Sequence, residues 1–366
     1  MKIILSANTS WYIYNFRKNT IIALLNDNHD ITVVSTYDDY TSKLINLGVK
    51  FKEVYMDKNS KNPIKDFYTI ASYRKIFKKI NPDIIFNFTP KSNIYSSLAA
   101  NCNKTRIVNN ISGLGNSFTS NRVLTFIVKF LYKLSSKKAT KIFFQNNDDL
   151  EFFINNSITS LEKAERIMGS GVDINRFYYC TPNTKTTTFI LSARLLISKG
   201  VQEYLDAAKF LKKKYHNTNY LILGFTDDNN KDYIKSDIIK KYEDEKIIKF
   251  LGKNDKIEKI LEQADCIVLP SYYKEGVPKT LLEGASMGKI IITTNLPGCK
   301  DTIIDGINGF FCDVKSSSSL IEKMEKVILM PYNDKLRMSI NSRKKAESEF
   351  DEKIIIDKYI NETLLS

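Results

Sequence analysis

CIVLPSYYKEGVPKTLLEGASMGKIIITTN, residues 266–295, is the stretch that decides the fold. It begins with the apolar run CIVLPS (266–271), which is typical of a strand buried on both faces of a sheet. A polar loop follows, and Pro278 is well placed in the first turn of a helix that continues to about Met287. A second apolar run, IIITTN (290–295), comes directly afterwards. A strand, a helix and a strand in this order predict one repeat of a parallel sheet.

The same alternation continues along the chain in both directions, with helical patterns such as VQEYLDAAKFLKKKY (201–215) between short apolar runs. The runs form two series: KIILSA (2–7), DITVVST (30–36), DIIFNFT (83–89), RIVNNIS (106–112) and KIFFQN (141–146), then TFILSA (188–193), YLILGF (220–225), KIIKFLG (246–252), the two runs above and GFFCDV (309–314). Two series indicate an α/β protein with two Rossmann-like, doubly wound domains that face a central crevice.

The stretch between the two series, residues 178–188, is polar and contains Pro182, so it is interpreted as a linker. We therefore predict an N-terminal domain over 1–180 and a C-terminal domain over 181–349. Residues 350–366 form a predicted helix that packs back toward the N-terminal domain. Because ligands in open α/β sheets bind at the carboxyl ends of the strands, functional residues are expected directly after strands.

Composition limits the class of protein. The chain has 366 residues, of which 43% are hydrophobic and 26% charged, as in soluble globular proteins. Its net charge of +14 favours an anionic partner, such as nucleic acid, a phosphate-bearing substrate or an anionic membrane. Five scattered cysteines without a C-x-x-C pair indicate a reducing compartment. The first strand turns polar too early for a signal peptide, and no apolar run is long enough to span a membrane.

The predicted helix of the opening stretch has a candidate anion-binding site at its N-terminus. The free N–H groups of residues 276–280 and the helix dipole form an anion site that suits a diphosphate. The residues of this donor-binding turn are Gly276, Val277, Pro278 and Lys279. Glu275 before the helix and Glu283 inside it can accept hydrogen bonds from hydroxyls on either side of the diphosphate, as a nucleotide sugar would present them. The alternative is that both are ordinary helix-start acids, favoured by the dipole.

A second candidate site is LSARLLISKG (191–200). A buried strand ends at Ala193, Arg194 follows at its tip, and Lys199 with Gly200 opens the next helix. Two cations at a strand end can neutralise a diphosphate leaving group, on which negative charge builds as the glycosidic bond breaks. The alternative is solvated surface charge.

These residues closely resemble glycosyltransferase family 4, whose members are retaining enzymes of the two-domain GT-B fold. The matching features are Arg194 with Lys199-Gly200, the E-x7-E pair Glu275/Glu283, GVDINRF (171–177), FLG (250–252) with Gly252, and LPGCKDTIIDGINGFF (296–311). The resemblance implies that Arg194 and Lys199 hold the donor diphosphate, that Glu275 contacts the donor sugar and that Glu283 contacts the ribose. It also implies that Gly252 lies on the donor side.

The N-terminal half resembles the bacterial branch that extends lipid-linked oligosaccharides, including N-acetylgalactosaminyltransferases, through WYIYNFR (11–17), TPKSN (89–93) and ISGLG (111–115). Relatives often carry a histidine on the acceptor side of the crevice, but neither His29 nor His216 fits that position. The predicted acceptor-side residues are instead Asn15, Lys91, Asn93 and Gly113. Gly113 and Gly115 lack the third glycine of a dinucleotide-binding fingerprint and more plausibly shape a loop at the crevice.

The resemblance implies a retaining transfer of N-acetylhexosamine or galactose from a UDP-sugar to a polyprenyl-diphosphate-linked oligosaccharide, in bacterial glycan, O-antigen or capsule synthesis. The UDP-sugar is a substrate, and no cofactor or metal is expected, because DDNNKD (227–232) is interpreted as a solvated loop. Two alternatives remain open. A GT-B sugar-nucleotide epimerase would need acids or bases in the crevice for proton abstraction. A nucleic-acid-binding protein would explain the charge, but the aromatic residues lie mainly within apolar strands and helices.

The segment NRVLTFIVKFLYKLSSKKATK (121–141) combines an apolar stripe with six basic residues: Arg122, Lys129, Lys133, Lys137, Lys138 and Lys141. It is either a packed helix whose lysines face water, or a face that meets anionic lipid, where each basic residue adds about 1 kcal/mol. The second interpretation predicts a cytoplasmic protein attached peripherally to the cytoplasmic face of the inner membrane.

Overall fold

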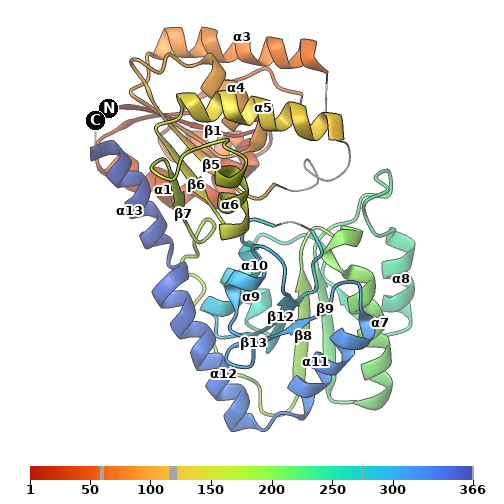
Figure 1. The fold of residues 1–366 in the computed structure, drawn as a ribbon. Coiled ribbons are helices and arrows are strands. Elements are labelled where there is room, and N and C mark those ends of the chain that lie inside the picture. Colours follow the sequence, from red (N-terminus) through yellow and green to blue (C-terminus); the bar gives the residue numbers. More distant parts are fainter. Residues whose placement is uncertain (58–61, 115–121, 274, 365–366) are drawn as a thin grey trace. The chain divides into compact units, whose positions relative to one another are not determined.

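The computed structural model describes residues 1–57, 62–114, 122–273 and 275–364. Gly115 of the Gly-x-Gly pair, Asn121 of the basic segment and the last two residues of the predicted terminal helix lie outside these ranges. The chain forms two compact units, Met1–Ser170 with Lys353–Ser366, and Gly171–Glu352 (Figure 1). Each unit is described by itself.

In its described residues, the first unit contains a seven-stranded parallel sheet in the order β3-β2-β1-β4-β5-β6-β7. Its strands are β1 (Lys2–Ser6), β2 (Asp30–Ser35), β3 (Lys50–Glu53), β4 (Ile84–Asn87), β5 (Arg106–Ile111), β6 (Lys141–Phe144) and β7 (Ala164–Arg166). Its helices are α1 (Ser10–Asn26), α2 (Thr41–Ile45), α3 (Pro63–Ile80), α4 (Pro90–Ala99), α5 (Arg122–Lys138), α6 (Asn147–Asn155) and most of α13 (Glu352–Leu364). The strand order reverses between β1 and β4, which makes this pair the switch point of the sheet.

Each face of the first sheet has its own core, because side chains of a strand alternate between the faces. Ile3 and Leu5 of β1 pack with residues of α1 and with Tyr359 of α13. Ile4, on the opposite face, packs with residues of α3, α4 and α5. Thus α1 and α13 cover one face and α3 to α5 cover the other, as Figure 1 shows.

The second unit contains, in its described residues, a six-stranded parallel sheet in the order β10-β9-β8-β11-β12-β13. Its strands are β8 (Thr187–Ser192), β9 (Thr218–Leu223), β10 (Lys249–Phe250), β11 (Cys266–Leu269), β12 (Ile290–Thr294) and β13 (Gly309–Cys312). Its helices are α7 (Val201–Lys214), α8 (Ser236–Asp244), α9 (Ile257–Leu261), α10 (Lys279–Ser286), α11 (Ser317–Leu329) and α12 (Tyr332–Lys345), with short helical turns η2 (Ile197–Lys199), η3 (Lys300–Thr302) and η4 (Ala346–Phe350). The two predicted doubly wound parallel sheets are confirmed.

The division between the units falls after Ser170, earlier than the predicted boundary after residue 180. Residues 171–180 belong to the second unit because hydrogen bonds attach them to it. The Ser286 hydroxyl donates to the Phe177 carbonyl at 2.7 Å, and the Cys180 amide donates to the Met287 carbonyl at 3.1 Å. These bonds join residues more than a hundred positions apart, so the sequence pattern does not reveal them.

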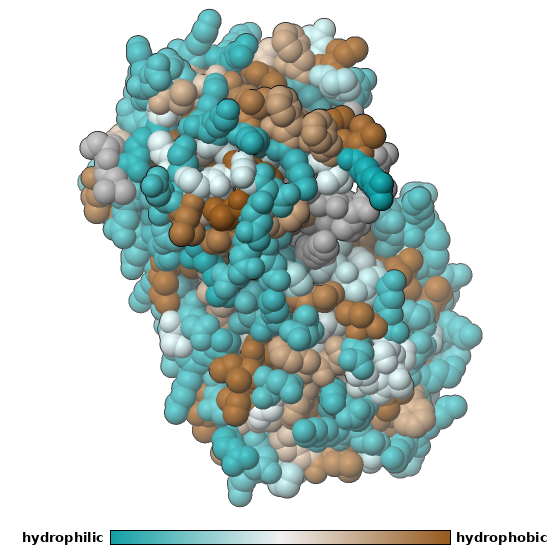
Figure 2. All heavy atoms as spheres, in the orientation of Figure 1, coloured by the Kyte–Doolittle hydropathy of each residue, from teal (hydrophilic) through white to brown (hydrophobic). Residues whose placement is uncertain are grey.

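Large apolar side chains are exposed on α3 and α5, which both pack against α4. Figure 2 shows hydrophobic residues gathered over these two helices at the top of the view. The exposed residues are Ile64, Phe67 and Tyr68 on α3, and Val123, Phe126, Ile127 and Phe130 on α5. Within the described ranges, none of the helices combines the length and the hydropathy that a membrane crossing requires.

Candidate active site

The predicted donor-side residues gather at the switch point of the second sheet, where the strand order reverses between β8 and β11. Arg194 and Lys199 follow β8, and Ser271 to Glu275 follow β11. Neighbouring parallel strands end at the same edge of a sheet, so the two loops meet there. The Tyr272 amide donates to the Ser198 carbonyl at 2.9 Å and ties one loop to the other.

Lys199 is held in place by the turn that follows it. Gly200 has φ +73°, and a Cβ at this position would lie 2.4 Å from the Pro270 carbonyl oxygen. Only glycine therefore permits the turn to approach the end of β11 so closely. The Lys199 side chain is buried, and its ammonium group lies 5.7 Å from the centroid of the Tyr273 ring.

Glu275 forms an ion pair with Lys199, in which Nζ contacts Oε1. The Ser271 hydroxyl donates to the same Oε1 at 3.0 Å. The side chains of both charged residues are nearly buried, with 10% and 12% of their surface exposed. A solvated helix-start acid would not have this environment, and α10 itself begins only at Lys279. The structure thus brings together two residues that lie 76 positions apart.

A loop after β12 presses against the peptide of Glu275. Gly298 has φ +78°, and a Cβ there would lie 1.5 Å from the Gly276 carbonyl oxygen and 3.0 Å from that of Glu275. The neighbouring Cys299 is fully buried, and burial, reinforced by the Glu275 charge, raises the pKa of its thiol to about 12. Sequence reasoning did not single out Gly298, although the Pro-Gly step in LPGC is a signal for a tight turn.

The N-terminus of α10 has no side-chain cap. Pro278 occupies the N-cap position, and no side chain makes a cap hydrogen bond there. Gly276, Val277 and Pro278 are buried, whereas Lys279 is partly exposed. Helix N-termini with uncapped N–H groups favour anions. The predicted donor-binding turn therefore has the electrostatics that a diphosphate requires.

Glu283 lies one turn further along α10, and it is only 5% exposed. Within the described part of the chain, its carboxylate makes no hydrogen bond. Burial raises the pKa of Glu283 to about 7; the positive charges of Lys279 and Arg176 oppose this rise, and Glu258 adds to it. A buried carboxyl group without a partner is costly, and a ligand hydroxyl would satisfy it.

Two further donor-side residues lie at the same edge of the sheet. Arg194 is exposed in the loop that follows β8. Gly252, after β10, has φ +62°, and its carbonyl accepts a hydrogen bond from the Gly224 amide at 2.9 Å. A Cβ at Gly252 would meet nothing within 4 Å, so space is open beside it.

Two of the predicted acceptor-side residues, Lys91 and Asn93, form hydrogen bonds and ion pairs within the first unit. The Lys91 ammonium donates to the Asp57 carbonyl at 2.8 Å and pairs with Asp66 at 2.9 Å. Asn93 is buried, and its amide bonds the backbone of Asn110 at 2.8 and 3.3 Å. Both side chains are thus bonded within the first unit, and their role toward an acceptor stays a prediction. 

The other two predicted acceptor-side residues are Asn15, which lies in α1, and Gly113, which lies in the loop after β5. Asn15 donates from its amide to the Trp11 carbonyl at 2.9 Å, within its own helix. Gly113 follows β5 with φ +101°, a conformation that favours glycine.

The acidic loop 227–232 helps to form α8. Asp228 accepts hydrogen bonds from the Ser236 amide at 2.8 Å and from the Ser236 hydroxyl at 2.5 Å. In the described ranges, no group of three or more histidine, cysteine or acidic residues lies close enough to hold a metal ion.

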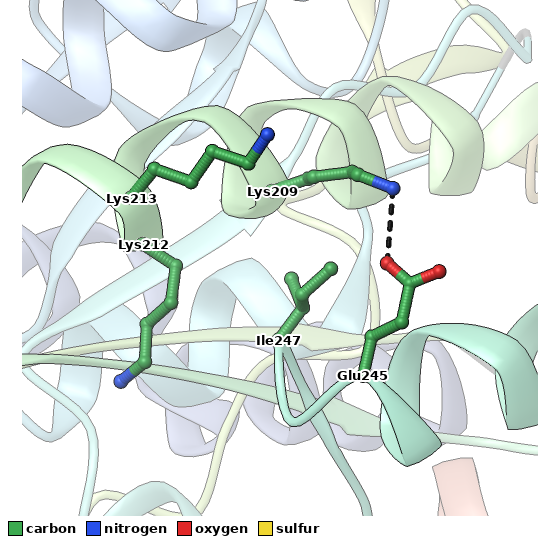
Figure 3. A pocket seen from close by; sticks show the side chains of 5 residues that line it. All are labelled: Lys209, Lys212, Lys213, Glu245 and Ile247. Atoms are coloured by element: carbon green, nitrogen blue, oxygen red, sulfur yellow. Dashed lines mark hydrogen bonds and ion pairs between the residues drawn. The ribbon is translucent and has the colours of Figure 1, made fainter.

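A hollow of about 370 Å³ lies elsewhere in the second unit (Figure 3). It is lined by Lys209, Lys212, Lys213, Glu245 and Ile247. The three lysines lie in the last two turns of α7, and Glu245 and Ile247 follow α8, beside the amino ends of the strands. Lys209 pairs with Glu245 at 2.9 Å, as Figure 3 shows. Because Glu275 follows the carboxyl end of β11, the hollow lies at the opposite edge of the sheet from Glu275.

A doubly wound unit with a lysine–glutamate pair and an uncapped helix start at its switch point is the arrangement expected of the donor half of a GT-B glycosyltransferase. Comparisons with known proteins agree. The family model "Glycosyl transferases group 1" matches residues 181–345, and "Glycosyl transferase 4-like" matches residues 2–146. The chain belongs to these glycosyltransferases.

The chain is similar to bacterial proteins that are named as glycosyltransferases of diphosphoundecaprenol-linked sugars. The chain is 29% identical, over 95% of its length and 94% of the relative, to N,N'-diacetylbacillosaminyl-diphospho-undecaprenol alpha-1,3-N-acetylgalactosaminyltransferase of Campylobacter jejuni. It is 25% identical to UDP-Gal:alpha-D-GlcNAc-diphosphoundecaprenol alpha-1,3-galactosyltransferase of Escherichia coli, over 79% of this chain and 76% of the relative. The crystal structure of Anabaena HepE in complex with UDP and glucose superposes with a TM-score of 0.78 at 18% identity, with full coverage of both chains. The predicted GT-B fold is confirmed.

Proposed function

We propose that this glycosyltransferase is a retaining, metal-independent enzyme that moves N-acetylhexosamine or galactose from a UDP-sugar to a polyprenyl-diphosphate-linked saccharide. The observation that carries the proposal is the Lys199–Glu275 pair beside the uncapped start of α10, with the buried Glu283 one turn along that helix. The helix start and Lys199 offer a positively charged site for a diphosphate. The two glutamates can accept hydrogen bonds from hydroxyls on either side of it.

Each residue then has a separate task in the transfer. The α10 N–H groups and Lys199 hold the diphosphate and stabilise the charge that it gains as the bond from the sugar breaks. Glu275 accepts hydrogen bonds from hydroxyls of the transferred sugar, and Glu283 accepts hydrogen bonds from those of the ribose. Arg194 is exposed at the same strand edge, from which it can turn toward a bound diphosphate. With these cations, the protein itself supplies the charge that a metal ion supplies in other transferases.

Retention follows from transfer on one face of the sugar. The acceptor oxygen forms the new bond on the side from which UDP departs, and the acceptor proton passes to the departing phosphate. This path requires no side-chain nucleophile. Cys299, the thiol that feels the Glu275 charge, is buried and neutral at physiological pH, because its pKa is about 12. It is therefore a poor candidate for a covalent intermediate.

The names of the relatives support both substrates. The Campylobacter and Escherichia coli proteins are named for undecaprenyl-diphosphate-linked acceptors, and the latter also for a UDP-sugar donor. On this basis we assign the chain to bacterial glycan, O-antigen or capsule synthesis. The comparisons give no support to the epimerase or nucleic-acid-binding alternatives.

A lipid-linked acceptor places the enzyme at a membrane, and the surface of α5 suits that location. Its exposed face combines apolar residues with basic ones: Val123, Phe126, Ile127 and Phe130 with Arg122, Lys133 and Lys137. The other three predicted basic residues are occupied within the first unit. Lys129 bonds Asn156, Lys138 bonds the carbonyls of Leu98 and Ala100, and Lys141 pairs with Glu165. We infer peripheral attachment to the anionic cytoplasmic face of the inner membrane through α5.

The test is a transfer assay with a short-chain polyprenyl-diphosphate-linked N-acetylhexosamine as acceptor. UDP-N-acetylgalactosamine, UDP-N-acetylglucosamine, UDP-galactose and GDP-mannose are offered singly, with and without a chelator. We expect a UDP-sugar to be transferred, with retention of the anomeric configuration by NMR and no effect of the chelator. Transfer from GDP-mannose alone would contradict the donor, an inverted product would contradict retention, and loss of activity with the chelator would contradict metal independence.

A further inference from the structure

The only tryptophan of the chain, Trp11, stands at the switch point of the first sheet. It lies in the first turn of α1, directly after β1, and 40% of its surface is exposed. The loop after β1 is tied to the loop after β4 by a hydrogen bond from the Asn8 amide to the Thr89 hydroxyl at 3.0 Å. In open α/β sheets, ligands bind beside the carboxyl ends of the strands at such a point.

The loops beneath Trp11 form a rigid support. The buried Ser10 hydroxyl bonds the hydroxyls of Ser35 at 2.8 Å and Thr41 at 2.9 Å. The Thr36 hydroxyl donates to the Asn8 carbonyl at 2.8 Å, so the loops after β1 and β2 are joined directly. A network of satisfied buried hydroxyls fixes the backbone from which the indole projects.

The indole itself has a defined position. The Trp11 amide donates to Asp38 Oδ2 at 3.0 Å, and the Phe16 ring packs edge-on against the indole at 5.7 Å between centroids. Tyr37 and Asp39, on either side of Asp38, are exposed and add a hydroxyl and a carboxylate to the surroundings. A large aromatic surface with a few polar groups is the common composition of small-molecule sites.

Saccharides fit this composition, because the apolar face of a sugar ring packs on an indole while its hydroxyls bond neighbouring polar groups. A lipid surface fits it less well. The seven exposed apolar residues of α3 and α5 form the membrane-facing candidate surface, and these two helices cover the opposite face of the sheet from α1. Carboxylates beside Trp11 would also be repelled by anionic lipid.

We propose that Trp11 and the loop after β2 form the subsite that binds the saccharide of the acceptor. The proposal rests on the proposed function, since it assigns the acceptor's sugar to the first unit. It adds to the predicted Lys91 and Asn93, whose side chains are bonded within the first unit, a residue whose indole is 40% exposed.

Tryptophan fluorescence tests the subsite without any turnover, because the single tryptophan reports on its own surroundings. The probes are farnesyl diphosphate carrying N-acetylhexosamine, farnesyl diphosphate alone, UDP alone and neutral phosphatidylcholine vesicles. We expect a saturable change in emission with the sugar-bearing probe and none with the other three. An equal change with the sugar-free probe or with vesicles would overturn the proposal in favour of lipid contact. No change with a probe that the wild type uses as an acceptor would overturn it as well.

Kinetics of Trp11→Ala separate this subsite from the donor site. The acceptor KM is expected to rise by roughly tenfold, the change that about 1.4 kcal/mol of lost stacking produces. The donor KM and UDP binding are expected to stay at wild-type values. The acceptor KM of Trp11→Phe, which keeps an aromatic ring, is expected to lie between those of the wild type and Trp11→Ala. The matched control is Phe210→Ala, because Phe210 on α7 is also an exposed aromatic residue, 53% against 40% for Trp11, and belongs to neither proposed site. An unchanged acceptor KM in Trp11→Ala would sink the subsite, whereas absence of transfer by the wild type would sink the proposed function instead.

Discussion

Replacing Gly298 by alanine should damage catalysis through Glu275 without touching a charged residue. The added Cβ would lie 1.5 Å from the Gly276 carbonyl oxygen, a separation that real contacts do not reach. The loop after β12 and the Glu275–Gly276 peptide must therefore move apart by about 1.5 Å to restore a 3.0 Å contact. Misplacement of a catalytic group by about 1 Å can cost about 10²-fold in rate. We expect kcat to fall by this order.

The matched control is Gly306→Ala in the same unit. Gly306 has φ +75°, close to the +78° of Gly298, but a Cβ there would meet nothing within 4 Å. Both variants carry the same backbone strain of about 1–2 kcal/mol, and only Gly298→Ala carries the collision. Comparing the two therefore isolates the displacement of Glu275 from general destabilisation.

The assay is steady-state transfer with the donor varied, together with calorimetric binding of UDP and thermal melting. Gly298→Ala should lose kcat, and its affinity for UDP should change less, because Glu283 lies beyond the displaced peptide on α10. If Gly298→Ala and Gly306→Ala had equal kcat values, the loop after β12 would not position Glu275 and the reasoning would be refuted.

Three further predictions concern charge and surface. The raised pKa of Glu283, about 7, means that its stabilising contribution is present below its unfolded value of 4.5 and is lost as pH rises through 7. Glu283→Gln should therefore gain a few degrees in Tm relative to wild type at pH 8 but not at pH 4.5, and parallel melting curves at both pH values would contradict this. Lys199→Ala should lower kcat, raise donor KM and cost about 3 kcal/mol in chemical denaturation, since Glu275 loses its partner in a nearly buried site. Arg194→Ala should show the same kinetic losses without the loss of stability, because Arg194 is exposed. Equal destabilisation by Lys199→Ala and Arg194→Ala would count against the Lys199–Glu275 ion pair. Phe126→Ser with Phe130→Ser should reduce sedimentation with anionic vesicles and leave UDP binding intact; unchanged sedimentation would exclude α5 as the attachment site.

Most of the sheet could be predicted from the sequence, because its central strands are continuous apolar runs. The edge strands β3 and β7 were not predicted. β3 has the sequence KFKE and is largely exposed, and β7 has only three residues, so neither has the apolar run that marks a buried strand. KIIKFLG was predicted as a strand over 246–252, but only Lys249 and Phe250 pair with β9.

The candidate site could be predicted only in part. Residue type and position after a strand indicated Glu275 and Lys199, yet their pairing depends on the turn at Gly200, which a spacing rule cannot represent. Lys91 was chosen by the same rule, and its contacts with Asp57 and Asp66 in the folded unit are ones that the rule cannot represent. Trp11 was part of a motif that carried a resemblance, and only its exposure in the first turn of α1, above hydrogen-bonded loops, indicated a role.

The central claim, that the E-x7-E pair divides the donor between its two acids, is tested most directly by steady-state kinetics of Glu275→Ala and Glu283→Gln with the donor varied. Glu275 contacts the transferred sugar, whose charge develops in the transition state, so its loss should lower kcat by roughly 10²-fold or more. Glu283 holds the chemically unchanged ribose, so its variant should raise donor KM and weaken UDP binding, with a smaller effect on kcat. If both variants kept the wild-type kcat and KM, the two glutamates would be ordinary structural acids and the assignment of the donor site would be contradicted.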